Sequence, residues 1–418
     1  FKMMSGMKNL KQAVMPIIWL NCIFCMGIFE IPINHPRYFL SIFYVISIMT
    51  GYFIIFYKGI HIFQQAFAFE FIIFHFVLGV HVLVAVLAII LFWWKSENMT
   101  NIIKSNSIAD HTLNTLGIKI EYEKTSRNIL NFVAIWSVCT ITVNILYIIW
   151  LYHDIGCWIA LYSCICICFP VMINSVVELT FASLIRQVIY FLKNTHTSCI
   201  KTRFQKTNIL INDVMLCANE SHAFKIRNKH GNTSITFIMV NYKIHKDKIM
   251  HLIRTLRHLH LEITKTGRQI NHIYCLQLLL ELAVHFTIVT SSIYCLYLTY
   301  SGQLRMVSNE KIIALAIWAS IYSIKIILMN ALCTSVSSEA YKTGEIIQSF
   351  EASLIDDDMR EEIHQFTQQI MLRSLNFTAF GFFSINNSLT GKFFATVTTY
   401  VVILIQINFV PNTIRTTK

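Results

Sequence analysis

Seven apolar segments of about 20 residues or more recur along the chain and limit what it can fold into. At a rise of 1.5 Å per residue, about 20 helical residues cross the hydrocarbon core of a bilayer. The segments are residues 38–57, 67–94, 129–151, 157–185, 278–300, 312–336 and 389–410. We therefore predict an all-α membrane protein with seven transmembrane helices.

The composition agrees with this interpretation. Hydrophobic residues make up 55% of the chain, charged residues only 13%, and the mean hydropathy is +0.56, which excludes a soluble globular domain. The net charge of +12 would suggest nucleic acid as a partner of a soluble protein. Here we expect a lipid bilayer instead, and no nucleic acid.

Lys and Arg residues gather in one set of connecting segments. Of the 34 in the chain, twenty-seven fall in 1–37, 95–128, 186–277 and 337–388, against five in the other connections and the tail. Cytoplasmic connections carry such an excess, so we predict a cytoplasmic N-terminus and an extracellular C-terminus. Apolar residues at helical spacing in 243–280 and 339–376 predict long helices that extend into a cytoplasmic anchor region.

Polar side chains recur along the last apolar segment. Lys392, Thr396, Thr399, Ile403 and Gln406 are spaced by four, three, four and three residues, so they share one helix face. Polar groups within a membrane usually face a bundle interior or a water-filled path. On the residues alone, this face either joins two helices or lines a pore, and both interpretations stay open.

The same segment resembles a known family. Residues 399–406 (TYVVILIQ) resemble the C-terminal signature of insect gustatory receptors, which is Thr-Tyr, five hydrophobic residues, Gln and then Phe. Ile407 stands where the family has Phe. The upstream run 377–383 (FTAFGFF) also resembles the segment that precedes this signature.

The resemblance implies a ligand-gated non-selective cation channel for a small-molecule tastant. It implies a homo- or heterotetramer with other gustatory receptor subunits, in the plasma membrane of sensory neurons. The pore-lining and gate residues would be Thr396, Thr399, Tyr400, Ile403, Gln406 and Ile407. Val401 stands where the sugar receptors of the family commonly carry Glu, which favours a bitter-type or fructose-type receptor.

These inferences divide the chain into functional regions. Residues 1–37 would be a cytoplasmic N-terminus with an amphipathic or re-entrant helix. Residues 38–336 would form a six-helix ligand-binding bundle that includes a cytoplasmic insert at 186–277. Residues 337–388 would be a cytoplasmic anchor helix and re-entry segment, 389–410 the pore-lining seventh helix, and 411–418 a short extracellular tail.

The ligand pocket is expected in the outer half of the first six helices, as in the family. Trp and Tyr rings there can stack on sugars and on aromatic alkaloids. The alternative role for each of them is to anchor the helix at the membrane interface or to pack within the bundle. Lys325 lies within the sixth segment, so its ammonium should face the interior with a partner or water, and Glu70 is a candidate partner. The candidates are Glu70, Tyr147, Trp150, Trp158, Tyr162, Tyr294, Tyr297, Trp318, Tyr322 and Lys325.

Other function classes are disfavoured. The chain has no Gly-rich phosphate loop, no Gly-x-Ser-x-Gly and no His-Glu-x-x-His, so we predict that it is not an enzyme. We expect no cofactor and no metal. A seven-helix G-protein-coupled chemoreceptor is the alternative, although its usual motifs are missing from the third and seventh segments. A secondary transporter is a weaker alternative, because no internal repeat is visible.

Overall fold

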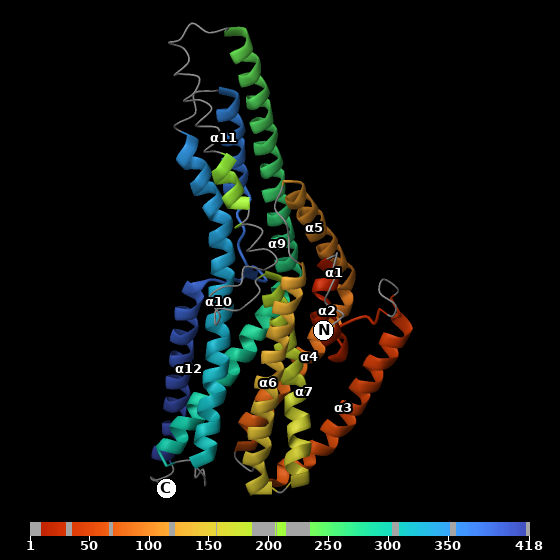
Figure 1. Cartoon of the computed structure of the whole chain (residues 1–418). Helices are drawn as coiled ribbons and strands as arrows, with labels where there is room; N and C mark the ends of the chain where they lie inside the picture. Colours follow the sequence, from red (N-terminus) through yellow and green to blue (C-terminus); the bar gives the residue numbers. More distant parts are fainter. Residues whose placement is uncertain are drawn as a thin grey trace.

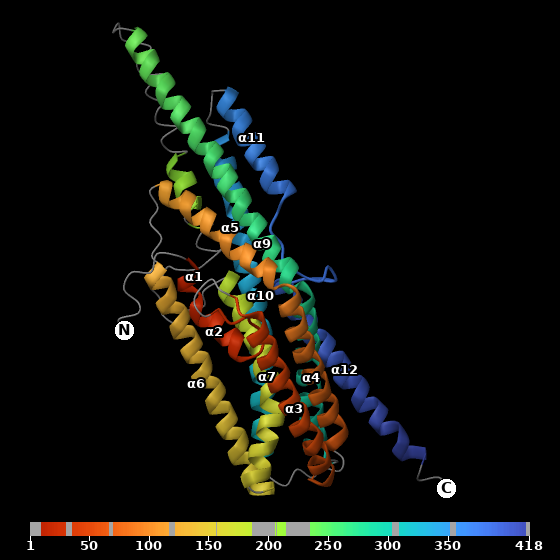
Figure 2. The same cartoon turned by 90° about the vertical axis from the view of Figure 1, so that its right-hand side faces the viewer.

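A computed structural model describes residues 10–30, 36–66, 70–116, 122–155, 157–185, 205, 207–214, 235–302, 309–351 and 357–414. The chain forms an elongated helical bundle from which helices extend at one end (Figures 1 and 2). Among these described residues, seven helices are long and apolar enough to cross a membrane, which confirms the predicted fold class. The side of the membrane that each end faces stays a prediction.

Five of the candidate spans are helices close to the predicted segments. The first four are α3 (Tyr38–Ala66), α4 (Glu70–Trp94), α6 (Tyr122–Ile155) and α7 (Cys157–Ile185), and the last is α12 (Asn387–Ile414). Between α4 and α6, the polar segment forms α5 (Ser96–Thr115), which packs against α9. Pro170 lies inside α7, as expected for a helix within a packed bundle.

The other two spans are parts of much longer helices. The α9 helix (Ile235–Tyr300) has 66 residues, so it runs without interruption from the hydrophilic insert through the fifth span. The α10 helix (Asn309–Glu351) likewise continues beyond the sixth span for a total of 43 residues. Both helices contact α11 (Asp357–Leu372), which forms the rest of the extension (Figure 1). The predicted projecting helices are therefore present.

An ion pair fixes α11 to α9. Glu362 of α11 is buried and accepts a hydrogen bond from Arg254 Nε of α9 at 2.7 Å. A second guanidinium, from Arg257, lies 3.5 Å from the other carboxylate oxygen. Because α11 is amphipathic, its apolar face (Ile363, Phe366 and Ile370) is buried at the same time.

A two-stranded antiparallel hairpin separates α11 from α12. Strands β1 (Thr378–Ala379) and β2 (Phe383–Ser384) pair with Thr378 opposite Ser384. Phe380 and Gly381 at the turn have φ of 51° and 80°, a left-handed conformation that glycine adopts readily. The segment that we predicted to re-enter the membrane is thus this hairpin, and its depth in the bilayer stays a prediction.

The amino-terminal helices are short. Helices α1 (Leu10–Ala13) and α2 (Met15–Ile23) pack against α6, and Asn21 Nδ2 of α2 donates to Thr180 Oγ1 of α7 at 3.0 Å. With nine residues, α2 is far too short to cross a bilayer, which needs about 20. Its length supports our choice not to count this region as a span.

The main hydrophobic core lies where α4, α5, α7, α9, α10 and α11 converge, and it continues into the hairpin. A second core joins α12 to the bundle. Phe393, Val397 and Val401 of α12 recur every four residues and are buried together with Val284 of α9 and Ile326 of α10. The α12 helix therefore has one apolar face against the bundle.

Candidate functional site

A cluster of charged and aromatic side chains lies inside the membrane-spanning bundle. Glu178 of α7 is at its centre: one carboxylate oxygen lies 2.8 Å from Lys325 Nζ of α10, and the other lies 3.0 Å from His285 Nε2 of α9. Lys325 also donates to Ser175 Oγ at 3.3 Å. We refer to Glu178, His285, Lys325 and the residues that contact them as the polar cluster.

Aromatic and neutral polar groups complete the polar cluster. Tyr322 of α10 is buried, and its hydroxyl lies 3.4 Å from Nε2 of His81, which belongs to α4. The Lys325 ammonium lies 5.3 Å from the centre of the Tyr322 ring, a distance that suits a cation–π contact. The Trp318 ring stacks on the Tyr322 ring with 5.8 Å between their centres, and Asn174 Nδ2 lies 3.3 Å from His81 Nδ1.

His285 has a constrained proton arrangement. Its Nδ1 lies 2.6 Å from the backbone carbonyl oxygen of Glu281, which can only accept, so Nδ1 must donate. The Nε2 atom faces the carboxylate of Glu178, so a hydrogen bond between them requires one proton on the ring or on the carboxyl group. His285 therefore contacts Glu178 through Nε2 and its own helix through Nδ1.

A metal ion is one alternative occupant. Ligand atoms of Glu178, Glu281 and His285 lie within 4.8 Å of one another. However, the Lys325 ammonium already neutralises Glu178 at 2.8 Å and would repel a cation. Glu281 accepts a hydrogen bond from Gln277 Nε2 at 3.4 Å. The arrangement therefore fits an internal ion-pair network better than a metal centre.

The polar cluster is connected to α12 through α10. Below Lys325 on this helix, Asn330 Nδ2 donates to Thr390 Oγ1 at 2.9 Å. One turn further, Thr334 Oγ1 accepts from the backbone nitrogen of Asn387 at 2.9 Å. One continuous helix thus contacts both the charged residues of the bundle and the beginning of α12.

The polar face predicted on α12 points away from the bundle. Lys392, Thr396, Thr399, Ile403 and Gln406 are all exposed, opposite the buried Phe393, Val397 and Val401. The hydroxyls of Thr396 and Thr399 donate to backbone carbonyls one turn back, at 2.8 and 3.0 Å. Within the described chain this face has no neighbouring helix, as Figure 2 shows by the way α12 diverges from the bundle.

The two remaining gate candidates lie beside this face. Tyr400 is half-exposed, with its ring 5.3 Å from that of Phe286 on α9. Ile407 is exposed.

The structure brings together three of the ten ligand-binding candidates: Trp318, Tyr322 and Lys325. Tyr147 is buried in a separate small core with Cys164 and Cys168. Tyr162 donates to the backbone oxygen of Ile55. Tyr294 and Tyr297 are partly exposed near the end of α9, and Trp158 is 82% exposed at the start of α7. The side chains of Glu70 and Trp150 lie outside the described residues.

Sequence analysis did not identify Glu178 as a partner of Lys325. Glu178 forms the ion pair because the register of α7 against α10 places it at the depth of Lys325, whereas the side chain of the candidate partner Glu70 lies outside the described residues. Sequence analysis also missed His81, Glu281 and His285. The sequence contained a clue to these three residues, because all of them lie inside apolar segments, where ionisable residues usually make contacts in the bundle interior.

A thiol pair was also overlooked. Cys22 and Cys25 have the Cys-x-x-Cys spacing that is typical of redox-active or metal-binding sites. Burial, together with the carboxylate of Glu30, raises the pKa of Cys22 to about 11, and burial raises that of Cys25 to about 11. Thiols of this kind are protonated at neutral pH and therefore unreactive.

Comparisons with known proteins agree with this architecture. The family model described as 7tm chemosensory receptor matches residues 19–410. Gustatory receptor 28b of Drosophila melanogaster is 24% identical over 307 residues, which are 71% of this chain. The chain spans 61% of the length of that relative.

The fold is similar to that of an insect olfactory receptor. The structure of receptor OR5 from Machilis hrabei superposes with a TM-score of 0.65 at 12% sequence identity, covering 95% of this chain and 98% of that one. The same receptor in complex with eugenol superposes with a TM-score of 0.58 at 13% identity.

Proposed function

Because the chain belongs to the 7tm chemosensory receptor family, we propose that it is a gustatory receptor that opens a non-selective cation channel when a small-molecule tastant binds. It is a multi-pass protein of the plasma membrane in sensory neurons.

The observation that carries the channel proposal is the exposed polar face of α12. Five residues at helical spacing, including two threonines and a glutamine, are exposed on a helix that must cross lipid. Such a face is costly against hydrocarbon, and a single helix cannot enclose a pore. Several copies of α12 around a common axis would satisfy both requirements. We therefore propose a homo- or heterotetramer, following the resemblance to gustatory receptors.

The polar cluster is our candidate for sensing the ligand. It offers a stacking platform (Trp318 and Tyr322), an ammonium and a carboxylate in one place. A hydroxylated or aromatic tastant can interact with these groups. The structural neighbour, an insect olfactory receptor, is known in complex with eugenol, which is a small molecule. The contacts of Asn330 and Thr334 with α12 would transmit a shift of α10 to the pore.

One position bears on the ligand class. Val401 stands where the sugar receptors of the family commonly carry Glu, and its apolar side chain is buried against the bundle. We propose a bitter-type or fructose-type receptor on this basis.

Whole-cell recording tests the function. Cells that express the chain alone should give an inward current to at least one member of a panel of fructose, other sugars and plant alkaloids. Replacement of sodium by potassium should leave the reversal potential almost unchanged, because the channel is non-selective. The current should persist when G-protein signalling is blocked. A response that disappears under this block would support the G-protein-coupled alternative instead.

The orientation gives a separate prediction. Epitope tags at the N-terminus and within 193–206 should be stained only after permeabilisation, and a tag after Lys418 should be stained on intact cells. The reason is the excess of Lys and Arg in the segments on the first side. Staining of the N-terminal tag on intact cells would contradict the inverted topology.

A further inference from the structure

A second, unrelated site lies where α9 leaves the membrane-spanning bundle. A cavity of about 380 Å³ is lined by one face of α9 and by Arg373, which follows α11. The lining residues are Leu261, Thr264, Lys265, Arg268, Gln269, His272 and Arg373. We refer to this cavity as the basic groove.

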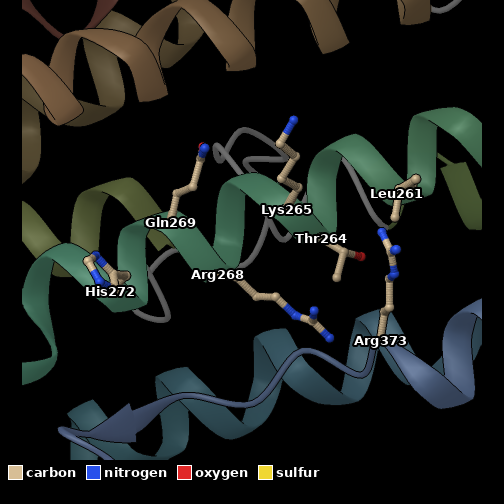
Figure 3. A pocket seen from close by; sticks show the side chains of 7 residues that line it. All are labelled: Leu261, Thr264, Lys265, Arg268, Gln269, His272 and Arg373. Carbon is tan, nitrogen blue, oxygen red and sulfur yellow. The ribbon is translucent and has the colours of Figure 1, made fainter.

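The charged side chains that line the basic groove are all cationic: Lys265, Arg268 and Arg373. Figure 3 shows Arg268 of α9 and Arg373 pointing into the gap between the two segments, while Lys265, which also lines the groove, projects from the other side of α9. No carboxylate is among the described residues that line the groove. The carboxylate of Glu262 is 4.0 Å from Lys265 Nζ, and both side chains are largely exposed. Among the described residues, the Arg268 side chain donates one hydrogen bond, from Nη2 to the Ser374 carbonyl at 3.0 Å, so donors of its guanidinium remain for a ligand.

A buried hydroxyl inside the basic groove has no partner. Thr264 is 3% exposed, and its Oγ1 atom accepts or donates no hydrogen bond within the described chain. In Figure 3 it points into the same gap as Arg268 and Arg373. A buried hydroxyl without a partner costs free energy, which a bound hydrogen-bonding group would recover. Two guanidiniums and a hydroxyl that converge in this way are suited to phosphate oxygens.

The basic groove lies at the edge of the membrane. Lys95 directly follows the last residue of the α4 span, and its Nζ donates to the carbonyls of His272 and Ile273, at 3.1 and 2.9 Å. His272 lines the groove. This contact therefore places one end of the groove at the level where a transmembrane helix ends, which is the level of lipid headgroups.

The hairpin, which contacts α9 next to His272 of the basic groove, carries exposed apolar side chains. Asn271 of α9 holds the hairpin by two hydrogen bonds to Thr378, at 3.0 and 3.4 Å. At the hairpin tip, Phe380 and Phe382 stack on each other and are 55% and 69% exposed. Aromatic rings beside cations are typical of surfaces that contact the membrane interface.

We propose that the basic groove binds a phosphate monoester of an anionic phospholipid headgroup, with the phenylalanines of the hairpin in the adjoining acyl region. The guanidiniums of Arg268 and Arg373 hold the phosphate oxygens, and the Thr264 hydroxyl donates the remaining hydrogen bond. Lys265 supplies further positive charge. Occupancy fixes the end of α11 and the hairpin against α9, just before α12 begins.

Binding to the full chain in nanodiscs, which expose both membrane faces, tests the proposal whatever the orientation. The probe is phosphatidylinositol 4,5-bisphosphate in phosphatidylcholine, with phosphatidylcholine alone as the reference. We expect the bisphosphate lipid to bind and to raise the unfolding temperature. The double variant Arg268→Gln/Arg373→Gln should bind at least about tenfold more weakly, because hydrogen bonds to charged groups contribute that much. Lys342→Gln, on the exposed surface of α10 outside the groove, should bind like the wild type.

Two further variants test the contributions of the groove and of the hairpin separately. Because Arg268 also holds the Ser374 carbonyl, Lys265→Gln is measured too, and it should weaken binding while leaving the unfolding temperature in phosphatidylcholine unchanged. Phe380→Ser/Phe382→Ser should weaken binding of the lipid but not of soluble inositol trisphosphate. Equal affinity for inorganic phosphate and for the lipid would assign the groove to a free anion and overturn the lipid proposal. Equal lipid affinity of the wild type and of the double arginine variant would overturn the site itself.

Discussion

Replacement of Lys325 by Met should remove most of the receptor from the cell surface. The substitution leaves Glu178 without its cationic partner inside the bundle, where the pair is separated by 2.8 Å. Breaking a buried ion pair by removing one member costs about 3–5 kcal/mol, which is a large part of the stability of a typical domain. Glu178→Gln should be damaging for the reciprocal reason. Surface protein is measured by antibody staining of an extracellular tag, and folding by the unfolding temperature of purified protein.

The double variant provides the decisive control. Glu178→Gln/Lys325→Met removes both charges, so it should recover much of the surface protein that either single variant loses. Lys342→Met, on the same helix but exposed beyond the span, should have no effect. Recovery of surface protein without recovery of the tastant response would assign the ion pair to sensing as well as to folding. A double variant no better than the worse single variant would contradict the pairing.

Replacement of Gln406 by Arg should lower the cation current at least about tenfold without loss of surface protein. Positive charges from several subunits around a narrow path would raise the barrier for cations by more than about 1.4 kcal/mol. Gln406→Glu should instead change the relative permeability to cations, because carboxylates favour their entry. The measurement is whole-cell current under cation substitution, normalised to surface protein.

A matched pair of threonines controls for damage to the helix. Thr398 and Thr399 both donate to backbone carbonyls one turn back, at 2.9 and 3.0 Å, and both are exposed. Only Thr399 belongs to the polar face, since adjacent residues are separated by about 100° around a helix. Thr399→Val should alter conductance, and Thr398→Val should not. Unchanged conductance in all variants of the polar face would leave it as a contact between helices.

The spans were predictable because the bilayer imposes a length on every helix that crosses it. The α12 face was also predictable, because a local 3.6-residue period needs no knowledge of other helices. The partner of Lys325 was not, since it depends on the register of α7 against α10, which no local pattern encodes. The basic groove was missed for the same reason: Arg268 and Arg373 are far apart in sequence, and only the packing of the segment after α11 against α9 joins them.

The continuity of α9 has a mechanical consequence. Between Ile235 and Tyr300 the helix contains no proline, and its one glycine, Gly267, lies against the buried Leu375. His285, in the polar cluster, is 50 residues from the distal end at Ile235, a distance of about 75 Å at 1.5 Å per residue. A tilt of only about 5° about His285 would therefore displace that end by about 6 Å if the helix stays straight. Because α9 is one continuous helix, a small tilt near the polar cluster is amplified along its length. A displacement of α9 by less than a bond length beside a ligand thus becomes a displacement of several ångströms at its distal end.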